Sequence, residues 1–440
     1  MNTDRHGMPI STDIDHAADR YREGMALTFA AWPGGAEALD AAIEADPEFA
    51  LPCAARARHY AMASEPGKAR EFMEKAIRLV AQRGDERERS HVDTLALLMA
   101  GRTKESLAKA LAHAEQWPRD ALILSLPLGA FGLFAFSGMR DHDQARVDLC
   151  EKHASHFGDD DWWFLTAYGW ALAEDGSVSR GRAMLEKAFE LRRQSANTVH
   201  ALTHAMFEGG AGGDAEKLIT GWLPDYDRSG ILHGHIAWHA ALVALERGDP
   251  NEAFQTYLDH VHPSVSQGMP INIVSDAASL LWRMDAYGHG APEGRWQEIA
   301  EYARTAFPRP GHAFVDAHMA MIEAATGAHA DLSERVAVLE TMAASGALGA
   351  GDVVPAIGRA SLAFAEGDYA RCVSILEPFA ADVARIGGSG AQREVIEDTL
   401  LVALMRSGEA AKAKALLDER LHRRPSPRDA RWKSQLPQAD

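Results

Sequence analysis

The sequence predicts an all-α protein built as an α-solenoid, in which pairs of antiparallel helices stack side by side. Three observations lead to this fold class. Hydrophobic residues make up 47% and charged residues 25% of the 440 residues, which is typical of a folded chain. Sustained alternation of β-branched residues is absent, and so are Asn-Gly turns between strand-like runs. Similar segments also recur along the chain, which is the signature of a repeat architecture.

The recurring segments share one skeleton: a small residue, a large apolar residue four positions on, and a second small residue three further. The small residues let a neighbouring helix approach closely, and the large residue fills the space between the two helices. Turns with Gly-Asp or Gly-Glu precede such helices in "ERGDPNEAF", "AEGDYARCV" and "RSGEAAKAK", where Gly ends the first helix of a pair. This pattern matches the second helix of a tetratricopeptide repeat. The skeleton falls on Ala69, Met73 and Ala76, on Gly181, Leu185 and Ala188, and on Ala413 and Leu417.

The middle and C-terminal parts divide into first (A) and second (B) helices of each pair. In a solenoid, successive A helices lie side by side and line the concave surface. We expect the array to be strongly curved, open or closed around a central pocket. The predicted A helices are 196–208, 234–247, 271–284, 312–326, 354–366 and 391–406. The predicted B helices are 214–222, 251–261, 293–306, 331–343, 369–384 and 409–421.

Composition narrows the environment and the partners. Lys and Arg total 45 against 63 Asp and Glu, so the formal net charge of −18 disfavours nucleic-acid binding. Three distant cysteines without a CxxC spacing fit a reducing, cytoplasmic location. The uncharged stretch 121–138 contains Pro127, Gly129 and Gly132, so it is expected to form buried helices and no membrane span.

Three regions are expected along the chain. Residues 1–20 are polar and are predicted to be an N-terminal tail, for which both an ordered and a disordered state stay open. Residues 21–425 are predicted to form a single helical-repeat domain. Residues 426–440 are predicted to be a C-terminal tail, and the basic stretch "RLHRRPSPRDARWK" is interpreted as a solvated end of the chain.

Histidines at helical spacing mark the strongest candidate site. His200 and His204 share one face of the first of two neighbouring A helices, and His235 and His239 share one face of the second. A His on a helix is more often a hydrogen-bonded structural residue than a ligand. Two such pairs on adjacent helices nevertheless predict a shared site, and Asp276 on the next A helix is expected to orient one imidazole.

Further polar residues on the same set of helices are candidates for binding a substrate. Glu208 continues the face of His200 and His204, and Trp238 lies between the two later histidines. Arg283 and Arg393 are expected to hold an anionic group. The full set of predicted substrate-binding residues is Glu208, Trp238, Arg283, Asp316, Gln392 and Arg393.

The sequence is compatible with two kinds of chemistry at this site, metal binding and metal-free acid/base catalysis. Imidazoles from two helices with a carboxylate suit a divalent transition metal ion. They also suit metal-free acid/base catalysis, because His titrates near neutral pH. One hypothesis is therefore a protein with a small-molecule pocket, used as an enzyme for hydrolysis, elimination or isomerisation. The alternative is a non-enzymatic scaffold that binds a peptide or a protein partner in its concave groove.

The ordered blocks "HALTHAMFEGG", "HGHIAWHAALVALERGDPNEAFQTYLDHV", "SDAASLLWRMDAYG", "FVDAHMAMIEAATG" and "IGGSGAQREVIEDTLLVALMRSG" resemble the tetratricopeptide repeat protein 38 family. The resemblance covers most of the chain and is clearest over 195–425. It implies a closed or strongly curved helical-repeat fold and supplies no reaction. Block positions that match the family include His200, His204, His235, His239, Asp276, Arg283, Asp316, His318, Gln392 and Arg393.

Overall fold

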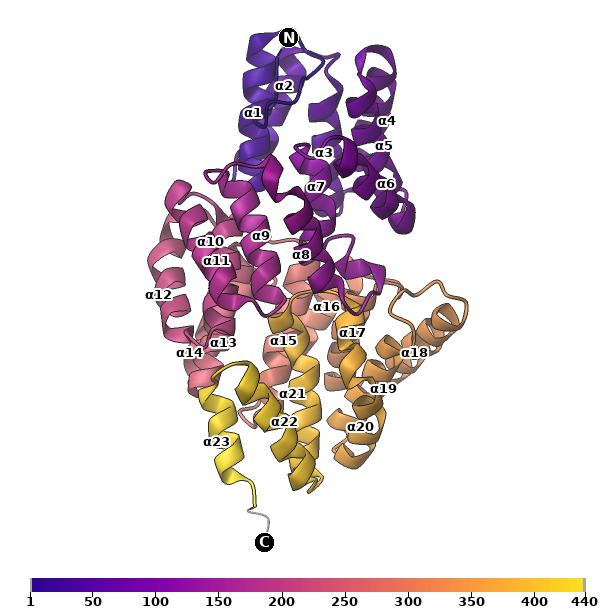
Figure 1. Cartoon of the computed structure of the whole chain (residues 1–440). Helices are drawn as coiled ribbons and strands as arrows, with labels where there is room; N and C mark the ends of the chain where they lie inside the picture. The colour runs from indigo at the N-terminus through magenta and orange to yellow at the C-terminus, as the bar shows by residue number, and fades with distance from the viewer. Residues whose placement is uncertain (1, 438–440) are drawn as a thin grey trace.

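A computed structural model describes residues 2–437 (Figure 1). Within this range the chain forms helices and no β-strand, apart from one isolated antiparallel bridge between Thr3 and Pro9. The all-α prediction is therefore confirmed. The first helices are α1 (Asp15–Phe29), α2 (Gly35–Ala45), α3 (Ala50–Met62), α4 (Pro66–Arg83), α5 (Glu86–Met99), α6 (Thr103–Gln116), α7 (Ala121–Leu128), α8 (His142–His153), α9 (Trp162–Glu174) and α10 (Val178–Leu191).

The remaining helices match the predicted A and B segments closely. The A helices are α11 (Ala196–Glu208), α13 (His233–Arg247), α15 (Pro270–Ala286), α17 (Ala313–Ala325), α19 (Val353–Ala365) and α21 (Gly390–Arg406). The B helices are α12 (Gly212–Trp222), α14 (Pro250–Thr256), α16 (Arg295–Ala306), α18 (His329–Ala344), α20 (Tyr369–Leu376) and α22 (Ala410–Arg423), followed by α23 (Pro427–Gln435). Short 3-10 segments are η1 (Ala135–Ser137), η2 (Ala154–His156), η3 (Leu223–Asp225) and η5 (Glu377–Ile386), and η4 (Tyr257–Val261) is a π-helical turn that extends α14.

Small residues determine how the two helices of a pair meet. Gly169 of α9 faces Gly181 of α10, and a Cβ added at Gly181 would lie 2.5 Å from the carbonyl oxygen of Gly169. Leu185 is fully buried beside them. The predicted skeleton residues are buried on α4, α10 and α22, as the repeat pattern requires. The helix pairs therefore pack by backbone approach with large side chains filling the gaps.

The A helices pack side by side, and the later ones form a closed ring. Successive A helices from α9 to α19 are in contact, and α21 packs against both α19 and α15. The indole nitrogen of Trp282 on α15 donates to Thr399 Oγ1 on α21 at 2.9 Å, across 117 residues of sequence. The superhelix is thus wound tightly enough for α21 to reach the inner face of much earlier helices.

Two regions differ from the sequence-based expectation for tails, and the apolar stretch 121–138 agrees with its prediction. Helix α1 begins at Asp15, inside the range predicted as an N-terminal tail, and Ile10 and Thr12 before it are buried. Helix α23 lies inside the predicted C-terminal tail, of which residues 438–440 lie outside the described residues. The apolar stretch 121–138 forms α7 and η1, and no helix among residues 2–437 is long and apolar enough to cross a membrane.

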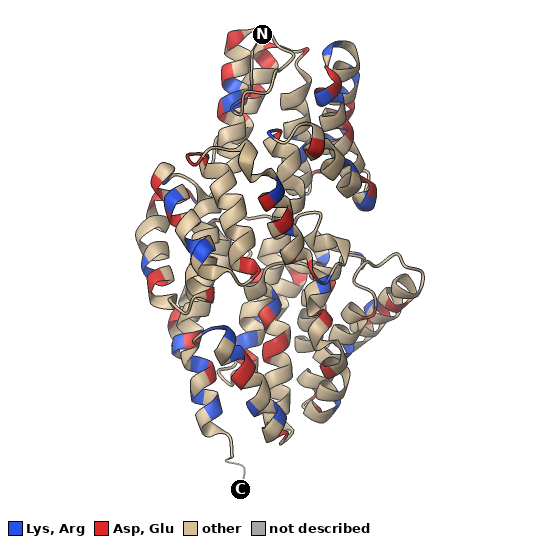
Figure 2. Cartoon of the chain, viewed as in Figure 1, with Lys and Arg blue, Asp and Glu red and all other residues tan. Residues whose placement is uncertain are grey.

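Charged residues of both signs are interspersed over the helices (Figure 2). The basic C-terminal stretch is not a solvated end, because Arg420, Arg424 and Arg428 are each buried. Their guanidinium groups pair with carboxylates of α21, including Glu394 and Asp398. Sequence alone could not show this, since the acidic partners lie a full helix earlier in the chain.

Candidate metal centre

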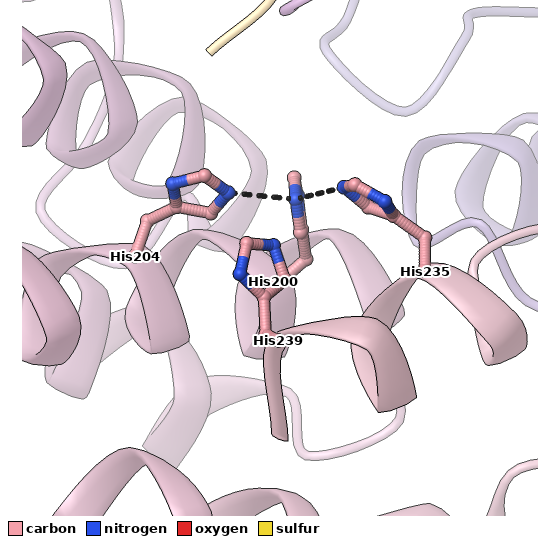
Figure 3. Close-up of side chains that lie close together, drawn as sticks. All are labelled: His200, His204, His235 and His239. Carbon is pink, nitrogen blue, oxygen red and sulfur yellow. Dashed lines mark hydrogen bonds between the residues drawn. The ribbon is translucent and has the colours of Figure 1, made fainter. Parts of the chain in front are cut away.

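Two adjacent A helices carry the four histidines to one place. Helix α11 begins at a Ser195 N-cap whose Oγ accepts from the backbone N–H of Thr198, and α13 ends at Gly248 with a left-handed φ of 95°. The i,i+4 spacing then directs two imidazoles from each helix toward the other (Figure 3). We call His200, His204, His235 and His239 the four-histidine cluster.

The ring nitrogens of the cluster are within reach of a single ion. His200 Nε2 lies 3.1 Å from His204 Nε2 and 3.0 Å from His235 Nε2. One nitrogen from each of the four rings lies within 4.8 Å of the others. Ligands on a tetrahedral zinc ion, about 2.0–2.1 Å from the metal, are about 3.3–3.4 Å apart. The four rings need shifts of only a few tenths of an ångström to about 1 Å to reach that arrangement.

Two carboxylates fix the orientation of one ring on each helix. Nδ1 of His235 lies 2.8 Å from Asp276 Oδ2, on α15. Nδ1 of His204 lies 3.1 Å from Glu174 Oε1, at the end of α9. A carboxylate beyond the ring is the usual outer partner of a metal-binding histidine, because it holds the proton on Nδ1 and leaves Nε2 free.

The proton balance of the cluster leaves hydrogen-bonding groups unmet when both carboxylates are ionised and the four rings are neutral. An ionised Asp276 only accepts hydrogen bonds, so Nδ1 of His235 then carries the proton and its Nε2 carries a lone pair. Nδ1 of His204 faces Glu174 at 3.1 Å without the geometry of a hydrogen bond, and we assign it the same tautomer from the charge of that carboxylate. Both lone pairs point at the same atom, His200 Nε2, which has at most one proton to donate. His239 Nε2 is buried and has no hydrogen-bond partner among the described residues. Lone pairs that converge without donors are the arrangement that a cation would satisfy.

Burial sets the ionisation of these groups. It lowers the pKa of His200 and His239 well below the ordinary value, and the neighbouring imidazoles lower both pKa values further. Burial also raises the pKa of Asp276, against the effect of His235. Burial acts on Glu174 in the same direction, but its hydrogen bond and attraction to His204 leave its pKa lowered overall. Neutral imidazoles beside a carboxylate are the state in which a metal binds.

Tryptophans enclose the cluster. The Trp238 ring stacks on His235 with centroids 5.4 Å apart, and Trp170 stacks on His200 at the same separation. His204, His235 and His239 are buried, whereas His200 is half-buried and gives the cluster its contact with solvent. Because the rings contact one another, the space between them leaves no room for an organic substrate.

Other predicted site residues have partners elsewhere. Arg283 donates to Asp398 and to the Ala391 carbonyl oxygen, so its charge is already used between α15 and α21. Asp316 pairs with Arg335 and accepts from the backbone N–H of His312. Arg393 pairs with Asp143 at 2.8 Å, which ties α21 to α8. We infer that these three residues hold helices together.

Glu208 and Gln392 are two further residues of the predicted site. Burial raises the pKa of Glu208 to about 7, although Arg424, 3.8 Å away, opposes this effect. Gln392 is buried at the start of α21, where its Oε1 accepts from the backbone N–H of Ser389 in a capping box. Its amide faces Asp276 and opposes the raised pKa of that carboxyl, but its Nε2 makes no hydrogen bond of normal geometry.

The candidate site residues expected from the sequence include neither Glu174 nor Trp170. Both lie on α9, which precedes the region that could be divided into A and B helices. Trp170 and Glu174 are four residues apart, so one face of α9 carries both. The same rule that found the histidine pairs would have pointed to Glu174, had α9 been recognised as the A helix before α11.

Two small cavities are lined by residues outside the cluster. One lies among Phe207, Leu242, Glu246, Arg283, Tyr287 and Glu394, and the other lies between the N-terminal segment and α1 and α7. Neither is lined by any of the four histidines. These two cavities therefore give no support to a small-molecule pocket lined by the histidines.

The fold is an all-α helical repeat built from tetratricopeptide-like helix pairs. No family model matches the sequence. A solved structure of a monomeric IFIT1 mutant with Gppp-AAAA is similar, with a TM-score of 0.42 and 11% identity over 96% of each chain. Yeast Tom70 is similar with a TM-score of 0.31 and 12% identity, covering 93% of this chain and 92% of that one. Because these TM-scores and identities are low, the repeat fold is assigned from the helix pairs of this chain and not from the similar structures.

Proposed function

We propose that this chain is a metal-binding helical-repeat protein whose four-histidine cluster holds one divalent transition-metal ion. Four imidazole nitrogens and no direct carboxylate or thiolate ligand suit Zn²⁺ and also Co²⁺, Ni²⁺ or Cu²⁺. The observation that carries the proposal is the convergence of Nε2 lone pairs, with Nδ1 of two rings fixed by Glu174 and Asp276. The two carboxylates also balance the charge of a divalent ion.

A binding role fits this geometry better than catalysis. Catalytic zinc sites keep one position open for water or substrate, whereas four protein ligands fill a tetrahedral site. We therefore place the ion in a closed centre that fixes the angle between two repeats, and we assign partner binding to the rest of the helical surface. A peptide or protein is the partner class that such repeats usually bind. The net charge of −18 disfavours nucleic acid.

We also propose a distant relation to the tetratricopeptide repeat protein 38 family. The support is the order of the sequence blocks that contain His200, His204, His235 and His239. Metal binding by a member with the same histidines, and its loss in a member without them, would separate a shared centre from a feature of this chain.

The experiment is metal analysis of the purified protein after chelation and reloading. We expect one equivalent of Zn²⁺ or Co²⁺ per chain, and the intense visible absorption of four-coordinate Co²⁺. At a free ion concentration 1,000 times the dissociation constant, binding adds about 4 kcal/mol to the free energy of unfolding.

The variants His204→Ala and His239→Ala test the ligands, and His329→Ala is the matched control because His329 is half exposed on α18. We expect the double variant to lose stoichiometric metal and the control to keep it. Retention of a full equivalent by the folded double variant, or no binding by the wild-type protein, would sink the proposal.

A further inference from the structure

The two carboxylates behind the histidines both lead to the same segment of the chain. Glu174 uses its two oxygens for different partners. Oε1 lies 3.1 Å from His204 Nδ1, and Oε2 accepts from the backbone N–H of Gly390 at 2.7 Å. The Glu174 side chain is 1% exposed, so water does not compete for either contact. One buried carboxylate thus joins a candidate metal ligand on α11 to the first residue of α21.

Asp276 makes the corresponding connection from the other histidine pair. Its Oδ2 lies 2.8 Å from His235 Nδ1. Its carboxyl lies near the Gln392 side chain, whose Nε2 is buried and makes no hydrogen bond of normal geometry. Gln392 in turn caps α21 through the backbone N–H of Ser389. The first turn of α21 is therefore hydrogen-bonded to Glu174 and lies beside Asp276, the carboxylate that contacts the other histidine pair.

The segment before α21 depends on its neighbours for its conformation. Gly387 and Gly388 have φ values of 87° and 79°, which favour glycine. A Cβ at Gly388 would lie 2.4 Å from the Phe314 ring, and one at Gly387 would lie 2.8 Å from the Ala135 carbonyl oxygen. A chain with two glycines in succession loses much conformational entropy when it is ordered, so its order requires strong contacts at its end.

We propose that Glu174 and Asp276 are positioning residues through which a bound ion fastens the segment 387–392 to the inner face of the superhelix. This inference rests on the proposed metal centre. An ion on Nε2 would withdraw electron density from the ring and strengthen the attraction between its Nδ1–H and the carboxylate, as a hydrogen bond at Asp276 and as the 3.1 Å contact at Glu174. The carboxylate is then held in one orientation, and its second oxygen is presented to the start of α21. Binding by the histidines and docking of α21 are therefore thermodynamically coupled.

The coupling reaches beyond the first turn of the helix. Helix α21 supplies Glu394 and Asp398, which pair with Arg420 of α22, and Asp398 also pairs with Arg283 of α15. A start of α21 that is held more firmly limits the local opening of this whole packing unit. The metal-loaded protein should therefore open less often at the point where the ring of A helices closes.

Hydrogen exchange of the backbone amides, followed by mass spectrometry, tests this inference on the full chain. Chelated protein and Zn²⁺-loaded protein are compared at peptides that contain residues 387–393. We expect at least 10-fold slower exchange at the Gly390 amide with Zn²⁺. The peptide around Asp368, at the start of α20, is the internal reference and should change little.

Glu174→Gln is the decisive variant, because the four histidines remain while the ionised acceptor is lost. We expect it to bind Zn²⁺ 10- to 100-fold more weakly, as outer partners of metal ligands do, and to lose the metal-dependent protection of Gly390. Glu377→Gln is the matched control, because Glu377 is a half-exposed residue of η5 that pairs with Lys412. It should keep both the affinity and the protection.

The outcomes separate this inference from the proposed function. Stoichiometric Zn²⁺ binding with unchanged exchange at 387–393 overturns the coupling and leaves the metal centre intact. Equal protection in Glu174→Gln and wild type overturns the role of Glu174. Absence of metal binding by the wild type overturns both. If Glu174→Gln does not fold, the comparison of chelated with Zn²⁺-loaded wild type still decides whether metal binding is coupled to exchange at 387–393. Asp276→Asn then replaces Glu174→Gln as the variant.

Discussion

Two buried polar clusters of this protein differ in how they meet their hydrogen-bonding and charge requirements. In the C-terminal charge network, Arg420 donates to carboxylates of Glu394, Glu397, Asp398 and Asp429, at 2.6 to 2.9 Å. Acid and base there neutralise each other within the chain. In the four-histidine cluster, nitrogens face nitrogens, and His239 Nε2 has no partner among residues 2–437.

The comparison teaches that burial of polar groups has two explanations that geometry can separate. A network that pairs every charge internally serves the fold, although burial makes it a modest source of net stability. A cluster whose donors and acceptors do not match costs free energy in the absence of a ligand. The first kind identifies a structural joint, and the second kind indicates where something from outside the chain binds.

The largest expected effect comes from breaking the internally paired network. Arg420→Ala removes the cation that four carboxylates share and leaves the two buried ones, Asp398 and Asp429, with Arg283 and Arg428 as their remaining cationic partners, so the free energy of unfolding should fall by about 3–5 kcal/mol. Urea denaturation measures this change. Arg423→Ala is the control, because Arg423 is 47% exposed and pairs with Glu397 at the surface, so it should cost less than about 1 kcal/mol. Equal losses of unfolding free energy in the two variants would mean that the C-terminal charge network does not hold α21, α22 and α23 together.

An intermediate effect is expected from His318, a buried histidine outside the cluster whose Nδ1 is hydrogen-bonded and whose Nε2 has no partner among the described residues. His318 is 1% exposed, its Nδ1–H donates to the Phe314 carbonyl oxygen at 2.8 Å, and burial lowers its pKa to about 4. The unfolded chain, with a pKa of about 6.5, binds this proton first as the pH falls. The free energy of unfolding should therefore decrease between about pH 6.5 and 4, by roughly 3 kcal/mol.

His318→Gln should remove this part of the pH dependence. Denaturation of metal-free protein at several pH values measures it, and His329→Gln, at an exposed position, should leave the slope unchanged. A slope that stays the same in His318→Gln would show that this histidine titrates normally in the folded protein.

The smallest expected effect concerns the cluster itself without metal. His239→Leu replaces an unpartnered buried nitrogen by apolar atoms of similar volume, so the chelated protein should change by no more than about 1 kcal/mol, toward higher stability. The same variant should lose the stabilisation by Zn²⁺. A large loss of stability in the chelated protein would mean that the four-histidine cluster, like the C-terminal charge network, meets its hydrogen-bonding requirements within the chain.

Sequence periodicity predicted the parts of the site that depend on local spacing. The i,i+4 pairs fixed which face each histidine occupies, and the repeat pattern made α11 and α13 neighbours. Glu174 was missed, because α9 had not been recognised as the preceding A helix. The order of helices along the chain was therefore sufficient to predict contacts between adjacent repeats.

Contacts between distant repeats could not be predicted in this way. Arg283 was expected to bind an anionic ligand, but its partner Asp398 is 115 residues away and is brought close only when the ring closes. The Gly390 contact with Glu174 spans 216 residues. Spacing within one helix carries no information about such pairs, since they depend on the summed curvature of every intervening helix pair.

The placement of all four imidazoles between positions 200 and 239 has a consequence for how the chain acquires its structure. Only α11, α12 and α13 must form before an ion can be captured, whereas the Trp282–Thr399 bond needs a loop of 117 residues to close. Early capture would set the tilt of one repeat on the next while the C-terminal third is still being made. The ion would then act as a template for the superhelix during synthesis.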